Sequence, residues 1–264
     1  YLKKYVYSLV FENKISQAIN TIKQNVGKSN TNFFDAYLLL IVDNLKKKNL
    51  DQAYKYVLNA YDLAEDDSLH LAILESLKQF IFVFKENKIL NNKKSFGKLS
   101  IISETFQRCY LGDPQTEMHF SNLFNDNEGN FKRYTYFYIS YLIEQNRIKD
   151  AKIIADDLKF INTTLLLLQG KSWIEKKRFQ KFNEFFSCKN YNDIVSEFFF
   201  IISNLYSSED NFEKSNFYLH LSTFLNPKFI FNLSLIAENQ FLNKEYKKAK
   251  KTLKKFKKEN DFYY

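Results

Sequence analysis

A short turn pattern recurs along this chain and constrains its fold more than any other feature. Each copy is a polar turn followed by an apolar residue, two polar residues and, in most copies, a small residue. The clear copies end at Ala18, Ala53, Ala151, Phe182, Ser215 and Ala249. Apart from the interval between Ala53 and Ala151, adjacent copies are 31 to 35 residues apart, a period typical of helical repeat proteins. The chain is therefore predicted to be an array of similar units.

The interval between Ala53 and Ala151 spans 98 residues and has room for two further copies. We place one at residues 112–117. The other lies at residues 86–89, where Glu-Asn-Lys-Ile repeats the residues found at 12–15. Residues 68–111 depart most from the pattern. The predicted units of a single repeat domain are approximately 1–30, 34–66, 68–94, 96–127, 131–162, 163–194, 196–229 and 230–263.

Apolar residues on both sides of each turn recur with the period of an α-helix. After the last turn, Tyr246, Ala249, Leu253 and Phe256 follow at spacings of 3, 4 and 3, which places them on one face of a helix. Each unit is therefore predicted to be two antiparallel helices joined by a tight turn. The chain has only 5 Gly and 2 Pro, too few for the turns of a β-sandwich or β-barrel. The predicted fold class is all-α.

The last two units carry a resemblance to a known family. Their recurring residues are Phe199, Ile202, Ser203, Tyr206, Phe212, Ser215, Leu219 and Pro227 in one unit, and Leu233, Ile236, Ala237, Gln240, Tyr246, Ala249 and Leu253 in the next. This pattern resembles the tetratricopeptide repeat, a helix pair of about 34 residues. In that family a small residue lets the paired helices approach, and Gly170, Ser203 and Ala237 occupy this position here. The resemblance implies a right-handed α-superhelix, or solenoid, of about eight antiparallel helix pairs, with the first helix of each pair lining a concave face.

The resemblance also implies a function, because such folds are mostly scaffolds for peptides and proteins. We expect a non-catalytic scaffold that binds a peptide or protein partner in the concave groove. The residue after the small position is Lys171, Asn204 and Glu238 in three successive units, at intervals of 33 and 34 residues. These side chains are predicted to form a polar ladder along the groove. The alternative is that they are ordinary solvated polar residues.

Lysine is concentrated near the C-terminal end of the sequence. Residues 243–260 contain nine Lys and two Glu, and so carry most of the formal net charge of +9. Lys247, Lys250, Lys251 and Lys254 form a candidate basic patch. It is interpreted either as the solvated outer face of the last helix or as a surface that binds nucleic acid or an anionic membrane. Because the rest of the chain is near neutral, we expect a protein partner rather than a nucleic acid.

No set of residues predicts catalysis, a cofactor or a metal ion. His70, His119 and His220 each stand without a second His or a Cys three or four residues away, which is the spacing that a metal site on one helix needs. We therefore expect that the protein is not an enzyme. Cys109 and Cys188 lie in different predicted units, and we expect buried free thiols rather than a disulfide.

Aromatic residues are abundant, and three of them are consecutive. Phe198, Phe199 and Phe200 span most of a helical turn, so their rings cannot all face the same side of a helix. We predict that they pack against a neighbouring unit. The alternative is an apolar surface for binding or for self-association, and the oligomeric state stays open.

The two ends of the sequence predict that the natural chain is longer. The sequence begins at Tyr1 and its only methionine is Met118, so we expect that the natural N-terminus is missing, and with it any signal peptide. The residues up to Tyr264 are expected to begin a further helix. No stretch approaches the roughly 18 uninterrupted apolar residues of a membrane span. A soluble protein is predicted, with the cytoplasm and the periplasm both open.

Overall fold

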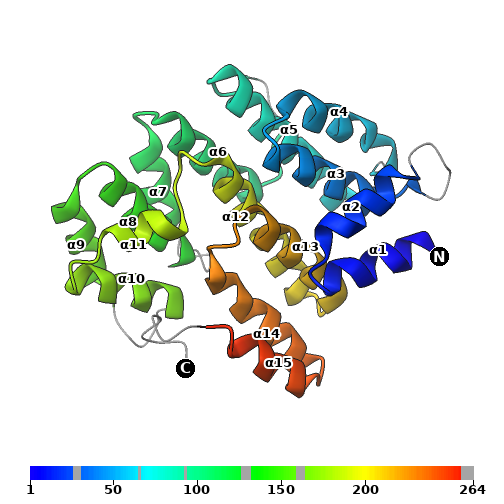
Figure 1. Cartoon of the computed structure of the whole chain (residues 1–264). Helices are drawn as coiled ribbons and strands as arrows, with labels where there is room; N and C mark the ends of the chain where they lie inside the picture. Colours follow the sequence, from blue (N-terminus) through cyan, green and yellow to red (C-terminus); the bar gives the residue numbers. More distant parts are fainter. Residues whose placement is uncertain (26–30, 65–66, 92–93, 126–131, 159–163, 257–264) are drawn as a thin grey trace. The chain divides into compact units, whose positions relative to one another are not determined.

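The computed structural model describes residues 1–25, 31–64, 67–91, 94–125, 132–158 and 164–256 (Figure 1). These residues form α-helices and short 3-10 turns and contain no strand. The all-α prediction is therefore confirmed. The chain divides into two compact units. Unit 1 comprises Tyr1–Ser103 and Val195–Pro227, and unit 2 comprises Glu104–Ile194 and Lys228–Tyr264.

Unit 1 is built from five helices along its first segment, the start of α6, and a helix pair that follows much later in the chain. The chain leaves unit 1 within α6 (Lys98–Leu111) and returns to it within α12 (Tyr191–Ser208). The other helices of unit 1 are α1 (Leu2–Phe11), α2 (Ile15–Lys23), α3 (Phe34–Lys46), α4 (Leu50–Asn59), α5 (Ser68–Glu86) and α13 (Phe212–Leu225).

In unit 2, most helices pack on helices that are close to them in the sequence. Contacts join α7 to α8, α8 to α9, α10 to both α8 and α9, and α14 to α15. The helices of unit 2 are α7 (Thr116–Asn125), α8 (Lys132–Glu144), α9 (Ile148–Asp156), α10 (Leu165–Glu175), α11 (Gln180–Phe185), α14 (Leu233–Leu242) and α15 (Tyr246–Leu253), with a 3-10 turn η4 at Ile230–Asn232.

Seven of the eight predicted turns share one backbone geometry. At the eighth, residues 86–89, Asn87 is also left-handed, but no helix follows it in the described residues before α6. A residue with left-handed φ, between 56° and 66°, ends the first helix of seven pairs, at Asn13, Lys48, Gly112, Asn146, Lys177, Asp210 and Lys244. The next residue donates its N–H to the carbonyl five residues back, as in Lys14 to Leu9 at 2.8 Å and Glu245 to Gln240 at 2.7 Å. This is the Schellman motif, which satisfies the last carbonyls of a helix. Glycine is the usual residue at this position, yet only one of the seven turns uses it.

Small residues lie where paired helices approach most closely. The hydroxyls of Ser203 and Ser215 are 2.9 Å apart and share a hydrogen bond, and those of Ser196 and Ser222 are 3.0 Å apart. Ser196, near the start of α12, pairs with Ser222 late in α13, whereas the later Ser203 pairs with the earlier Ser215. Helices α12 and α13 are therefore antiparallel, as predicted. At Gly170, a Cβ atom would lie 3.2 Å from the Tyr136 ring and 3.4 Å from the Phe182 ring. Glycine is therefore needed there by packing, because α10 contacts large rings.

Helix α13 packs against both α1 and α3 in unit 1 (Figure 1). The rings of Tyr7 and Phe217 stack with their centroids 5.0 Å apart, although the two residues are far apart in sequence. In a simple solenoid each repeat contacts only its neighbours, so this packing is an addition to the predicted array. The superhelical arrangement itself stays a prediction.

The aromatic residues account for much of the core in each unit. In unit 1, Phe198 packs edge-to-face on Phe80 and Phe199 lies beside Tyr218, and all four rings are buried. Phe198 and Phe199 are therefore core residues, but their partners lie in the predicted units 68–94 and 196–229 and not in a unit next along the chain, and Phe200 is half-buried. In unit 2, one buried cluster joins rings from five segments of the chain: Phe106, Tyr136, Phe137, Trp173, Phe182, Phe186, Phe229 and Phe231.

The two cysteines of the chain are joined in unit 2. Cys109 on α6 and Cys188, which follows α11, form a disulfide with their Cα atoms 5.5 Å apart, and both are buried. The expectation of free thiols was wrong. The reason is the aromatic cluster: the ring of Phe186 lies 5.9 Å from that of Phe106 and 4.6 Å from that of Phe137. This packing brings the segment after α11 against α6. Cys109 and Cys188 are therefore close in space although they are far apart in the sequence.

Candidate functional site

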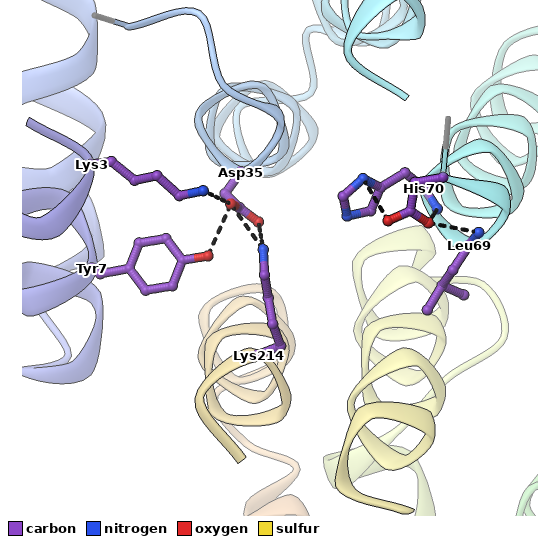
Figure 2. Close-up of polar contacts among 7 residues, drawn as sticks. Lys3, Tyr7, Asp35, Leu69, His70 and Lys214 are labelled. Carbon is purple, nitrogen blue, oxygen red and sulfur yellow. Dashed lines mark hydrogen bonds and ion pairs between the residues drawn. The ribbon is translucent and has the colours of Figure 1, made fainter. Parts of the chain in front are cut away.

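A buried carboxylate organises a cluster of polar side chains in unit 1 (Figure 2). Asp35 lies in the first turn of α3 and is 1% exposed. The Tyr7 hydroxyl donates a hydrogen bond to it at 2.9 Å, and the Lys214 ammonium donates to its two oxygens at 2.8 and 3.0 Å. Lys3 adds an ion pair at 3.7 Å. A buried charge is stable only when paired and hydrogen-bonded, and these contacts meet that requirement.

The electrostatics of this cluster keep Tyr7 in the form that donates to Asp35. Burial raises the pKa of Tyr7 well above its usual value, and the negative charge of Asp35 raises it further. Tyr7 is therefore protonated at neutral pH and acts as a donor. Because both oxygens of Asp35 accept hydrogen bonds from within the chain, the carboxylate serves to hold α1, α3 and α13 together.

His70 and Asp67 lie beside this cluster at the start of α5 (Figure 2). Asp67 caps the helix by accepting the N–H groups of Leu69 at 2.9 Å and His70 at 3.0 Å. The His70 ring stacks on Phe34 with the ring centroids 3.8 Å apart, and its Nδ1 lies 3.3 Å from Asp67. Burial lowers the pKa of His70, although the charge of Asp67 acts in the opposite direction. The imidazole is therefore neutral at neutral pH.

The other end of α13 is also held by α3. The Lys46 ammonium donates to the carbonyl oxygen of Phe224 at 2.5 Å and lies 4.1 Å from the centre of the Phe224 ring. A cation is favourable at a helix C-terminus, where carbonyl groups lack helical partners. Contacts from Asp35 to Lys214 and from Lys46 to Phe224 show that α3 and α13 run parallel. Helix α13 therefore covers part of the first helices of the predicted units 1–30 and 34–66.

The three residues of the predicted polar ladder are divided between the two units. Asn204 lies on α12 in unit 1 and is exposed, and Glu238 lies on α14 in unit 2 and is exposed. Lys171 lies on α10 in unit 2, is half-buried, and donates to the carbonyl oxygen of Leu158 at 3.2 Å. The three residues belong to first helices of predicted pairs, as expected. Their alignment in one groove stays a prediction.

The candidate basic patch lies on the last described helix. Lys247, Lys250 and Lys251 project from α15, Lys254 is its C-cap, and all four are exposed. Lys257 and Lys258 of the predicted lysine run lie outside the described residues, as does the expected helix at Tyr264. The apolar stripe predicted for this helix is only half correct: Ala249 and Phe256 are buried, but Tyr246 is 57% and Leu253 50% exposed.

A second group of polar contacts surrounds the disulfide loop of unit 2. The Ser187 hydroxyl donates to Glu144 at 2.6 Å, and the Ser187 N–H donates to Asp193 at 3.1 Å. Burial raises the pKa of Asp193 to about 7, against the opposing hydrogen bonds from Ser187 and Asn190. These contacts fasten the loop that carries Cys188 to α8 and to the first turn of α12.

The described residues contain no group of three or more His, Cys, Asp or Glu side chains arranged to hold a metal ion. None of the helices in the described ranges combines the length and the apolar character needed to cross a bilayer.

Reasoning from the sequence missed the cluster around Asp35. Tyr7 precedes Asp35 by 28 residues and Lys214 follows Asp35 by 179 residues. No local spacing in the sequence therefore reveals the cluster. The one signal in the sequence is an acidic residue among the apolar residues that open α3. Comparison with known proteins found no family model that matches the chain, no similar curated protein and no similar solved structure.

Proposed function

We propose that the protein is a non-catalytic scaffold of tetratricopeptide-like helix pairs that binds a peptide or protein partner. The observation that carries this proposal is the repeated Schellman turn together with small residues between paired helices. These two features build helix pairs of similar geometry from dissimilar sequences. Repetition of one helix pair is typical of proteins that present extended binding surfaces.

The same packing supports the choice of binding residues. Ser203 and Ala237 are buried between paired helices. The next residue along a helix is rotated by about 100°, and accordingly Asn204 and Glu238 are exposed. We place partner contacts on these two residues and on Lys171. Because α13 already covers part of α1 and α3, those two helices are not proposed as the binding surface.

Site-specific crosslinking tests the proposal. A photoreactive amino acid at position 204 or 238, introduced into the full chain, should capture the same protein from a lysate of the source organism. The matched control is position 152, since Lys152 is exposed on the second helix α9. The double variant Lys171→Glu with Asn204→Ala should weaken capture at position 238 by roughly fivefold, as for residues of moderate importance in an interface. Equal capture from positions 152, 204 and 238 would contradict the proposed surface.

A further inference from the structure

One face of the α14–α15 helix pair exposes large apolar side chains next to lysines. We call it the hairpin face and define it by Phe241, Leu242, Tyr246, Lys247, Lys250, Leu253 and Lys254. The four apolar members are 60%, 51%, 57% and 50% exposed, in sequence order. Single exposed apolar residues are ordinary, whereas contiguous ones mark interaction sites. Phe241 and Tyr246 are contiguous, because their ring centroids are 5.3 Å apart.

Helical geometry arranges these side chains in two rows along α15. Ala249 and Thr252 are buried, α15 packs on α14, and the Thr252 hydroxyl donates to Gln240 of α14 at 2.8 Å. Tyr246 and Leu253, seven residues apart, lie together at one edge of this buried side. Lys250 lies beside them, and Lys247 and Lys254 form the next row. An apolar row and a cationic row therefore run side by side over two helical turns, about 11 Å.

The positive charge of this face is not balanced locally. Lys248 pairs with Glu245 at 2.7 Å, but Lys247, Lys250 and Lys254 make no ion pair with any carboxylate in the part of the chain that the structure describes. Cations elsewhere are often paired, as Lys23 and Lys47 are with Asp43 and Arg147 is with Glu117. The hairpin face thus combines exposed apolar area with charge that only an anionic partner can complement.

We infer that the hairpin face docks an acidic amphipathic helix of a partner protein. A helix laid along α15 would place apolar residues, spaced at i, i+3 or i+4 and i+7, on Tyr246 and Leu253. Its flanking Asp or Glu residues would meet Lys250 and Lys254. The inference is independent of the proposed ladder, because it uses different residues and a different kind of contact.

Other anionic partners fit this face less well. Nucleic acids bind by stacking bases on exposed aromatic faces, whereas the rings of Phe241 and Tyr246 meet edge-to-face and so do not form a flat stacking platform. On an interfacial membrane helix the apolar side turns to the lipid. Here Ala249 of α15 and Phe256, which follows the helix, are buried in the protein.

Binding of designed peptides to the full chain tests the inference. The probe is a fluorescent amphipathic peptide of roughly 18 residues, with Leu at helical spacing and Glu beside it. Fluorescence anisotropy at roughly 100 mM salt should give a Kd on the order of 10 μM. The same peptide with Lys in place of Glu, and a scrambled peptide of equal composition, should each bind at least about tenfold more weakly. These comparisons need no protein variant.

Two variants and a matched control locate the contact. Lys250→Glu with Lys254→Glu should weaken binding about tenfold, and so should Tyr246→Ala with Leu253→Ala. The control is Lys149→Glu, Lys152→Glu and Ile153→Ala on α9, where Ile153 is 63% exposed and both lysines are exposed. It should leave binding unchanged. Equal binding of all three peptides, equal loss in the control, or tighter binding of single-stranded RNA or phosphatidylserine vesicles than of the acidic peptide would overturn the inference.

Discussion

At the scale of single residues, the donors around Asp35 hold helices together that are distant in sequence. Tyr7, Lys214 and Lys3 surround a carboxylate that is almost completely buried. Loss of one donor leaves part of a buried charge unsatisfied, which costs more than the loss of an exposed hydrogen bond. Removal of one donor from this cluster should therefore lower the free energy of unfolding more than removal of a donor from an exposed hydrogen bond.

The variant Tyr7→Phe tests this dependence with little change of shape. It removes the hydroxyl that donates to Asp35 and keeps the ring that stacks on Phe217. We expect the free energy of unfolding to fall by about 1–3 kcal/mol, measured by urea denaturation. The control Tyr37→Phe removes an exposed hydrogen bond to Asn32, and its effect should stay within about 0.5 kcal/mol. Equal effects of the two substitutions would show that the carboxylate does not depend on Tyr7.

His70 gives unit 1 a dependence on pH. Its pKa is lowered in the folded protein by burial, so as the pH falls the unfolded chain takes up the proton first. The contribution of His70 to stability is complete above its unfolded pKa of about 6.5. It is lost as the pH falls through the folded pKa.

The comparison of His70→Phe with the natural chain isolates this effect, since a phenyl ring can keep the stack on Phe34. Between about pH 7.5 and pH 5.5, the natural chain should lose more unfolding free energy than the variant. Urea denaturation at both values measures the difference. Parallel losses in the two proteins would mean that His70 is not responsible.

At the scale of the element, six turns place a non-glycine residue in the left-handed region. This conformation costs roughly 1–2 kcal/mol for a residue with a Cβ atom, and glycine avoids that cost. The cost is repaid because each turn satisfies helix-end carbonyls and joins two packed helices. The low glycine content thus leaves room for stabilisation by substitution.

The variant Lys177→Gly should stabilise the protein by about 0.5–1 kcal/mol, because Lys177 has φ 56° and glycine adopts it without strain. Its neighbour Lys176 has φ −82°, so Lys176→Gly should destabilise the protein by a similar amount. Thermal unfolding followed by circular dichroism gives both values. Two shifts of the same sign would contradict the left-handed assignment.

Local features were the ones that could be predicted from sequence. The turns at Asn146, Lys177 and Asp210 and the buried small residues are set within one helix pair, so the 34-residue period is enough to locate them. The packing of α13 on α1, the donors of Asp35 and the disulfide depend on contacts between distant segments. The exposure of Tyr246 was not predicted for a related reason. The spacing of apolar residues shows which side of a helix is apolar, but it does not show how much of that side another helix covers.

At the scale of the whole molecule, the disulfide closes a long segment within unit 2. The joined cysteines are 79 residues apart, and a cross-link over such a span restricts the unfolded chain strongly. The double variant Cys109→Ala with Cys188→Ala should lower the free energy of unfolding by about 2–4 kcal/mol. Dithiothreitol should destabilise the natural chain similarly and leave the variant unaffected. A variant as stable as the oxidised natural chain would contradict this role.

The same cross-link has a consequence for cell biology. Glutathione and thioredoxin keep thiols reduced in the cytosol, whereas cystines persist in the periplasm, the secretory pathway and the extracellular space. A chain that folds around a buried Cys109–Cys188 bond is therefore expected to mature after export. Maleimide labelling of the chain from acid-quenched cells should find no reactive thiol until a reductant is added, and two afterwards.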